Sequence, residues 1–333
     1  MLGAILKFSF SLLLIFWLLK SGKLDFTLTS TFFNKHLTTA FLFFFLYSIS
    51  STLGALRWKI LLQSRGSERY SFIAILKTHW IGLFFNSILP GAVTGDLIKL
   101  AYKKQIDPKL SKTFFLGTVF LDRLVGLLGL ITLMGTFSLI NYTKIISISD
   151  QLKNIIHFNF LIFFGATLIT AFLLLPKKIH NFFLNLLSKV PIIGNKAGYF
   201  FEQIWIIGSK RTLLLGCIFL SMLIQTISIF LFWKIITPLT DHFFPLYQAF
   251  IVAPIGFISM ALPLAPSGLG VGHAIFETLL SFFQVKQGAS LFNVYFICVI
   301  LFNLTGSIPY IISSIKIKSK QNDLKELRPT HES

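Results

Sequence analysis

Apolar residues in this chain fall into long runs separated by short polar segments. The runs lie at about 5–22, 37–56, 71–98, 113–140, 155–175, 212–236, 248–283 and 292–315. Since a helix needs about 20 apolar residues to cross a bilayer, each run is a possible crossing. The pattern predicts an all-α polytopic membrane protein.

Two of the runs are interrupted by residues that break helices. Proline removes a backbone donor and glycine frees the backbone, so neither run is expected to form one straight helix. Lipid tolerates broken backbone only where protein or a water-filled cavity covers it. We therefore predict two re-entrant hairpins that face each other and form the site. The breaks are at Pro90 and Gly91 in run 71–98, and at Pro263 and Pro266 in run 248–283.

The charge of the connecting segments predicts the topology. Segments 57–69, 99–112 and 177–211, and the tail from 316, are all basic. Basic loops normally lie on the cytoplasmic side. Because basic loops flank run 71–98 on both sides, this run should enter and leave by the same face. The sequence thus predicts about six full crossings and two hairpins, with both termini cytoplasmic. Eight full crossings is the alternative.

This topology implies an internal repeat. Each half reads helix, helix, hairpin, helix, with three crossings, so the second half is inverted relative to the first. We expect one transmembrane domain at 1–315, with pseudo-repeats at about 1–140 and 141–315, and a basic cytoplasmic tail at 316–333. Inverted repeats with broken helices near the midplane are typical of secondary transporters.

Composition narrows the function classes. Of 333 residues, 54% are hydrophobic and 13% charged, and the formal net charge is +18. Binding of nucleic acid would need a soluble basic domain, which we do not predict, so the positive charge is expected to meet anionic lipid headgroups. Cys217 and Cys298 lie in apolar runs and are read as small buried side chains. No catalytic constellation, metal-ligand cluster or cofactor motif is visible, so we do not expect an enzyme.

Four ionisable residues lie within or at the edge of the apolar runs: Asp96, Asp122, Arg123 and Glu277. A charge at the centre of a transmembrane helix costs roughly 2.5–3.5 kcal/mol on insertion scales, so such groups usually have partners or face a cavity. The guanidinium of Arg123 suits a carboxylate or a phosphate. Arg123 either binds substrate or pairs with Asp96 or Glu277 to tie helices together. Asp122 either assists Arg123 or is a polar packing group.

Other polar groups at the breaks extend the predicted site. Asp96 either caps the helix after the first break or lines the site, and Asn86 adds an amide. The backbone N–H groups of Gly268 and Gly270 are suited to hold a phosphate. Glu277 either binds a coupling proton or cation, or pairs with Arg123. His79 and His273 are lone histidines, better explained as structural residues than as ligands.

Three motifs in order resemble a known family. They are Asn86 with Leu89-Pro90-Gly91 and Gly95-Asp96, then Leu121-Asp122-Arg123 with Gly126, then Pro263 with Pro266-Ser267-Gly268-Leu269-Gly270 and Glu277. They resemble the transmembrane region of lysylphosphatidylglycerol synthases and its stand-alone flippase-like, UPF0104-type relatives, over about 5–315. The resemblance implies a lipid translocase in which residues matching Asp96, Arg123 and Glu277 act. Lys99 stands where arginine is expected, and we expect no soluble aminoacyl-transferase domain in this sequence.

Together with the charge pattern, this resemblance implies a flippase-like protein of the cytoplasmic membrane. Its cargo would be an anionic or aminoacylated phospholipid or a polyprenyl-phosphate glycolipid. The alternative is a membrane subunit of a lipid- or glycolipid-modifying enzyme whose catalytic domain is on a separately encoded partner. A homo-oligomer is compatible with either. The predicted substrate-binding residues are Arg123, Asp96, Glu277, Asn86, Lys99, Asp122, Gly268 and Gly270.

Overall fold

The computed structural model describes residues 25–65, 70–89, 94–175, 210–261 and 270–313, with isolated residues at 16, 19–20 and between 179 and 205. All regular structure in these residues is helical, as the sequence predicts. The elements are α2 (Thr27–Lys35), α3 (Leu37–Leu62), η1 (Gln63–Arg65), α4 (Phe72–Ile88), α5 (Thr94–Ala101), α6 (Lys103–Ile106), α7 (Lys112–Ile140), α8 (Tyr142–Ile146), α9 (Asp150–Leu173), α12 (Arg211–Ile236), η2 (Thr237–Leu239), α13 (Leu246–Ala261), α14 (Val271–Ser281) and α15 (Gly288–Leu304).

Within these residues, five helical segments are long and apolar enough to cross a membrane. They are α3, α7, α9, α12 with the η2 turn, and a segment Gly288–Ser313 that begins with α15. Each corresponds to a predicted run, which makes this chain a polytopic membrane protein. The predicted first crossing at 5–22 lies almost wholly outside the described residues, as does the tail at 316–333.

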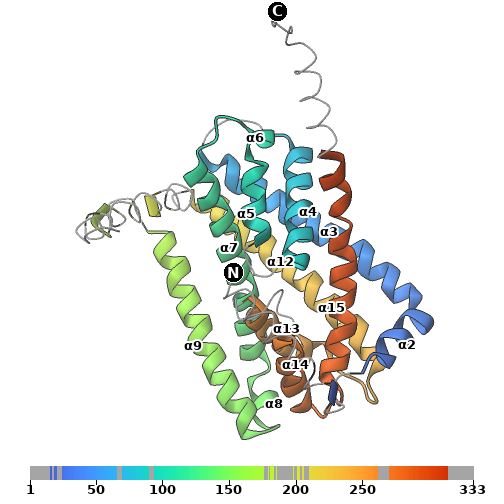
Figure 1. The fold of residues 1–333 in the computed structure, drawn as a ribbon. Coiled ribbons are helices and arrows are strands. Elements are labelled where there is room, and N and C mark those ends of the chain that lie inside the picture. The colour runs from blue at the N-terminus through green and yellow to red at the C-terminus, as the bar shows by residue number, and fades with distance from the viewer. Residues whose placement is uncertain are drawn as a thin grey trace, which may run out of the picture.

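Helix α7 is at the centre of the bundle. In its most apolar window, 72% of the residues are buried, against 17% for α9. Helix α12 packs against both α3 and α7, whereas α9 packs on the outside of α7 (Figure 1). The outward side of α9 carries exposed large apolar side chains such as Phe158, Leu161 and Leu168. A polypeptide surface of this kind is stable against lipid tails, which are as apolar as the side chains themselves.

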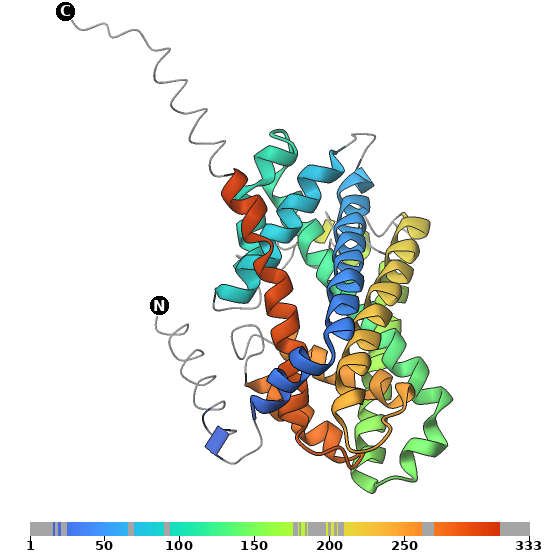
Figure 2. The ribbon, with the colours of Figure 1, turned by 90° about the vertical axis from the view of Figure 1, so that its right-hand side faces the viewer.

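The two interrupted runs each form a pair of short helices that fold back on one another. Helices α4 and α5 pack together at one end of the bundle, and α13 and α14 pack together at the opposite end (Figures 1 and 2). The interruptions occur where the sequence predicts them. The turns themselves, with Pro90, Gly91, Pro263, Pro266 and Gly268, lie outside the described residues.

Two glycines allow α4 and α5 to approach closely. A Cβ atom on Gly95 would lie 2.0 Å from the carbonyl oxygen of Gly82 and 2.7 Å from the side chain of Asn86. The Asn86 Oδ1 accepts the Gly95 N–H at 2.8 Å, which fixes the start of α5 against the end of α4. The backbone contact therefore determines where the next residue, Asp96, is held.

Replacing Gly95 by alanine should destabilise the protein by about 1–3 kcal/mol or more, because the new methyl group meets backbone, which has little room to move. Gly216 is the matched control: it lies within α12, and its added Cβ would have no atom within 4 Å. Alanine there should be neutral or stabilise by up to about 1 kcal/mol. Thermal unfolding of both variants in detergent measures the difference. Equal effects would contradict the assigned contact.

Candidate functional site

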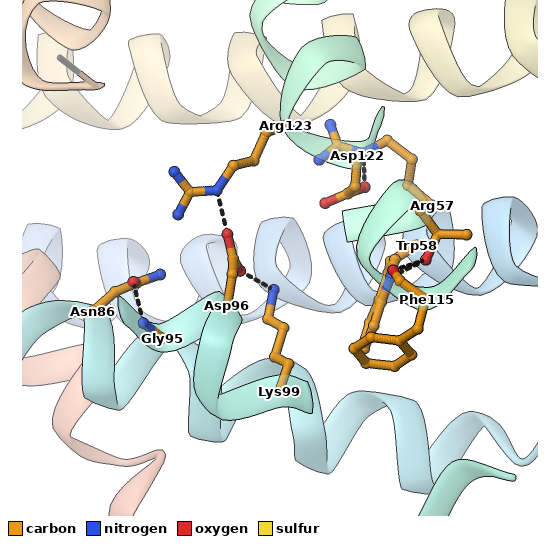
Figure 3. Close-up of polar contacts among 10 residues, drawn as sticks. Arg57, Trp58, Asn86, Gly95, Asp96, Lys99, Phe115, Asp122 and Arg123 are labelled. Atoms are coloured by element: carbon orange, nitrogen blue, oxygen red, sulfur yellow. Dashed lines mark hydrogen bonds and ion pairs between the residues drawn. The ribbon is translucent and has the colours of Figure 1, made fainter. Parts of the chain in front are cut away.

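Asp96 is the residue on which the polar contacts converge. It lies in the first turn of α5, is 4% exposed, and accepts from two cations (Figure 3). Its Oδ1 is 2.8 Å from Lys99 Nζ, and its Oδ2 accepts from Nε of Arg123 on α7. Of the two partners considered for Arg123, the structure gives Asp96. The carboxylate thus joins the short helix α5 to the central helix of the bundle.

Lys99 lies one turn after Asp96 and is also buried. It was expected to begin a basic loop, but it is inside α5 and only 7% exposed. Gly82 makes room for its chain, since a Cβ there would lie 2.5 Å from Lys99 Cε. Its Nζ lies 5.1 Å from the ring centre of Trp58 on α3, a cation–π contact. Lys99 therefore balances the charge of Asp96 and binds α5 to α3.

A second ion pair lies beside the first, and it involves a residue that the sequence analysis missed. Arg57 was expected in a cytoplasmic loop beginning at that residue, but α3 continues to Leu62 and Arg57 is 8% exposed. Its Nε donates to Oδ1 of Asp122 at 2.7 Å, and its Nη1 donates to Oγ of Ser221 at 2.7 Å. Asp122 therefore pairs with Arg57 and not with its neighbour Arg123. One guanidinium connects α3, α7 and α12.

Arg123 is the most accessible of the five residues in these ion pairs. Its side chain is 39% exposed, against 6% for Asp96 and 9% for Arg57. In Figure 3 its terminal nitrogens point away from Asp96. Arg123 lines two neighbouring cavities, which also share Phe257 of α13 and Tyr295 of α15. It is thus the charged group that both cavities present to a ligand.

The larger cavity, called here the apolar chamber, has a volume of about 790 Å³. Helices α5, α7, α12, α13 and α15 form it. Its polar lining consists of Asp96, Arg123, Gln225, Ser228 and Tyr295, and the rest of the lining is apolar. Two of its apolar residues, Leu97 and Phe120, are 59% and 48% exposed at the surface. The apolar chamber therefore reaches the surface between α5 and α7.

The smaller cavity, called here the polar chamber, has a volume of about 300 Å³. Its polar lining residues are Tyr47 of α3, Asn86 and Ser87 of α4, Arg123 of α7, and Tyr295 and Asn303 of α15. It therefore combines one cation with several neutral hydrogen-bonding groups. Asn86, predicted as a site residue, lies here.

A third cavity of about 560 Å³ lies between α7, α9, α13 and α14. It is almost entirely apolar, and it shares Ile258 with the apolar chamber. Asn159, only 2% exposed, lines it, and its Nδ2 has no hydrogen-bond partner among the described residues. Its lining contains no charged side chain.

Glu277 and Gly270 have structural contacts away from Arg123. The Glu277 Oε2 accepts the N–H of Ala289 at 2.9 Å, in the first turn of α15. Gln287, the residue just before α15, has φ +57° and its side chain does not cap the helix. Glu277 therefore satisfies one of the free N–H groups at this helix terminus. The Gly270 N–H donates to Nδ1 of the buried His273, whose Nε2 is 3.1 Å from Oδ1 of Asn293. His273 thus connects the start of α14 to Asn293 of α15.

The three ion pairs do not balance in charge. Arg57, Lys99 and Arg123 are three cations, whereas Asp96 and Asp122 are two carboxylates. Segments 90–93 and 262–269, which lie outside the described residues, contain no charged residue. Counted formally, the cluster carries one excess positive charge inside the bundle. A bound anion at Arg123, the most exposed of the three cations, would balance this charge.

Comparison with known proteins agrees with this membrane architecture. Over 90 residues the chain is 29% identical to a UPF0104 membrane protein of Pyrococcus horikoshii, a match that covers 27% of each protein. The chain thus aligns with only about a quarter of that relative. A family model described as the lysylphosphatidylglycerol synthase transmembrane region matches residues 4–305, nearly the whole chain. This protein therefore belongs to the lysylphosphatidylglycerol synthase transmembrane-region family.

Proposed function

We propose that this protein binds the anionic headgroup of a membrane lipid at Arg123 and moves it between the leaflets. The observation that carries the proposal is the position of Arg123, partly exposed at the wall shared by the apolar and polar chambers. Guanidinium groups bind phosphate through paired hydrogen bonds. An anion there would neutralise the excess positive charge of the cluster.

The shapes and linings of the chambers support an amphipathic ligand. An acyl chain fits the apolar chamber, whose exposed residues Leu97 and Phe120 lie between α5 and α7. The headgroup would then face Arg123 and the polar chamber. Such a ligand could enter sideways from the bilayer, so that its chains never leave an apolar environment.

The arrangement of the short helices supports movement across the membrane. The pairs α4–α5 and α13–α14 extend inward from opposite ends of the bundle (Figures 1 and 2). We assign them as re-entrant hairpins of two inverted halves, about 1–140 and 141–315. Rocking of one half against the other would open the chambers to alternate sides, as in other repeat transporters.

The ends of α3, α9 and α15 and the starts of α4, α7 and α12 share one end of the bundle (Figure 1). The exposed lysines Lys104 and Lys109 lie at this end, between α5 and α7, and the basic segment 177–211 joins α9 to α12. By the positive-inside rule this end is cytoplasmic. The C-terminus then lies in the cytoplasm, and the α4–α5 pair enters the membrane from the cytoplasmic side, through the inner leaflet.

Translocation should be measured in proteoliposomes that contain the purified protein and headgroup-labelled lipids. Phosphatidylglycerol, an anionic lipid, should cross faster than zwitterionic phosphatidylethanolamine, and protein-free vesicles set the background. Dithionite quenching or a chemical modifier outside the vesicle reads the accessible fraction with time. Rates equal to background for every anionic lipid, with protein that is folded and inserted, would contradict the proposal.

A further inference from the structure

We infer that the lipid bound at Arg123 carries an uncharged, hydroxyl-rich headgroup, of glycerol to monosaccharide size, beyond its phosphate. This inference rests on the proposed function only in placing the phosphate at Arg123. It concerns the polar chamber. With the phosphate at Arg123 and the acyl chains in the apolar chamber, the rest of the headgroup would occupy the polar chamber. A group of this chemistry matches both the hydrogen-bonding capacity and the charge of that chamber.

An unpartnered amide points to the missing ligand group. Asn303 on α15 lines the polar chamber and is 8% exposed. Its Nδ2 donates to Oγ of Ser87 at 2.8 Å, but its Oδ1 has no hydrogen-bond partner among the described residues. A buried acceptor left without a donor is costly, so a donor is expected there when the chamber is filled.

Hydroxyl groups fit this environment better than other donors. The polar chamber offers two tyrosines, Tyr47 and Tyr295, two amides and a serine, all neutral. A hydroxyl both donates and accepts, so it satisfies the Asn303 amide in either orientation of its O and N atoms. Several neutral groups around one small space are suited to a ligand with several hydroxyls.

An ammonium group does not fit. Of the residues described as lining the polar chamber, none is a carboxylate. Asp96, on the other side of Arg123, is already in contact with two cations. The undescribed turns 90–93 and 262–269 and the first 24 residues of the chain contain neither Asp nor Glu. An aminoacyl or ethanolamine headgroup would thus bring a cation to a site that is already positive, without a counterion.

Arg123 places the two parts of such a lipid. Because it lines both chambers, a phosphodiester at its guanidinium would direct the acylated glycerol to the apolar chamber and the headgroup alcohol to the polar chamber. Phosphatidylglycerol and a sugar-phosphate lipid both have this order of groups. The shared chemistry is a phosphodiester with a polyhydroxyl substituent.

Equilibrium binding to the full chain in detergent tests this inference independently of transport. Short-chain phosphatidylglycerol, phosphatidylinositol, phosphatidic acid and lysyl-phosphatidylglycerol are titrated, and binding is followed by the thermal stability that each confers. One of the two polyhydroxyl lipids should bind about tenfold more tightly than phosphatidic acid, which has no headgroup alcohol. The lysyl lipid should bind most weakly. Which polyhydroxyl lipid binds tighter distinguishes a glycerol from a sugar-like headgroup.

Three variants locate the effect in the polar chamber. Asn303→Leu removes the amide at nearly constant volume and should reduce binding of the preferred polyhydroxyl lipid to the level of phosphatidic acid. Ser87→Ala should reduce it severalfold, which provides a second test if Asn303→Leu folds poorly. Asn159→Leu is the matched control, because it removes a buried amide, also with one unpartnered atom among the described residues, from the third cavity. It should leave the lipid order unchanged.

The alternative outcomes are distinct. Tightest binding of lysyl-phosphatidylglycerol, or equal binding of phosphatidic acid and both polyhydroxyl lipids, overturns the inference even if anionic lipids are translocated through Arg123. The predicted order of binding without translocation of any lipid sustains the inference and overturns the proposed function. An effect of Asn159→Leu equal to that of Asn303→Leu would show that the selectivity does not arise in the polar chamber.

Discussion

Arg123→Ala should abolish lipid translocation while leaving the fold intact. Truncating one partner of a hydrogen-bonded charge pair in a binding site typically costs about 2–5 kcal/mol, which corresponds to a loss of about 30-fold to several thousandfold in affinity. Alanine also removes the excess positive charge of the cluster, because Lys99 alone then faces Asp96. The fold should survive, since Asp96 keeps the 2.8 Å contact with Lys99 and is not left unpaired.

Two further variants separate charge from geometry in the same proteoliposome assay. Arg123→Lys keeps the charge but loses the planar fork, so the rate should fall to an intermediate value. Arg211→Ala, at the exposed start of α12, removes an equal charge far from the chambers and should have little effect. A wild-type rate in well-folded Arg123→Ala would remove the central element of the proposed mechanism.

The sequence predicts most of the helical architecture because apolar runs and helix-breaking residues are local signals. The five long segments overlap their predicted runs, with ends displaced by up to about six residues, as at the end of α3, and the two interruptions fall at the predicted breaks. The predicted repeats, domain limits and orientation of the termini remain predictions, as these depend on a membrane and on segments outside the described residues. These three predictions rest on the distribution of basic loops along the sequence, and not on contacts between residues in the structure.

The polar contacts were harder to predict because they join residues far apart in the chain. The pairing of Arg123 with Asp96 was one of two alternatives, since both carboxylates lie at hairpin breaks. Glu277 is instead used at the start of α15, where Gln287 provides no cap. Nothing local to Glu277 indicates that a helix twelve residues further on needs an acceptor.

Arg57 was missed because a cluster of basic residues after an apolar run resembles the end of a crossing. A signal for its true position does exist in the sequence. Asp122 lies next to Arg123 on a helix, and neighbouring residues point in directions about 100° apart, so the two side chains cannot readily pair with each other. Asp122 therefore needed a cation on another helix. Arg57 is the first cation after run 37–56.

The Arg57–Asp122 pair should be the polar contact in the described part of the bundle that is most costly to break from one side. Its two side chains are 9% and 11% exposed, and the guanidinium is also held by Ser221. Gly126 leaves the space for it: a Cβ there would lie 3.3 Å from Arg57 Nη1. Either single substitution, Arg57→Leu or Asp122→Leu, would leave an unpaired charge among three packed helices.

Each single variant should lose about 3–5 kcal/mol of stability, the usual cost of breaking a buried ion pair from one side. The double variant Arg57→Leu with Asp122→Leu should recover most of this loss, because no unpaired charge remains and leucine suits an apolar interior. Unfolding of the four proteins in mixed micelles gives the coupling energy of the pair. Additive losses in the double variant would mean that the two charges act separately. Recovery of stability together with wild-type translocation would show that this pair maintains the bundle, while Arg123, one residue along the same helix, performs the transport.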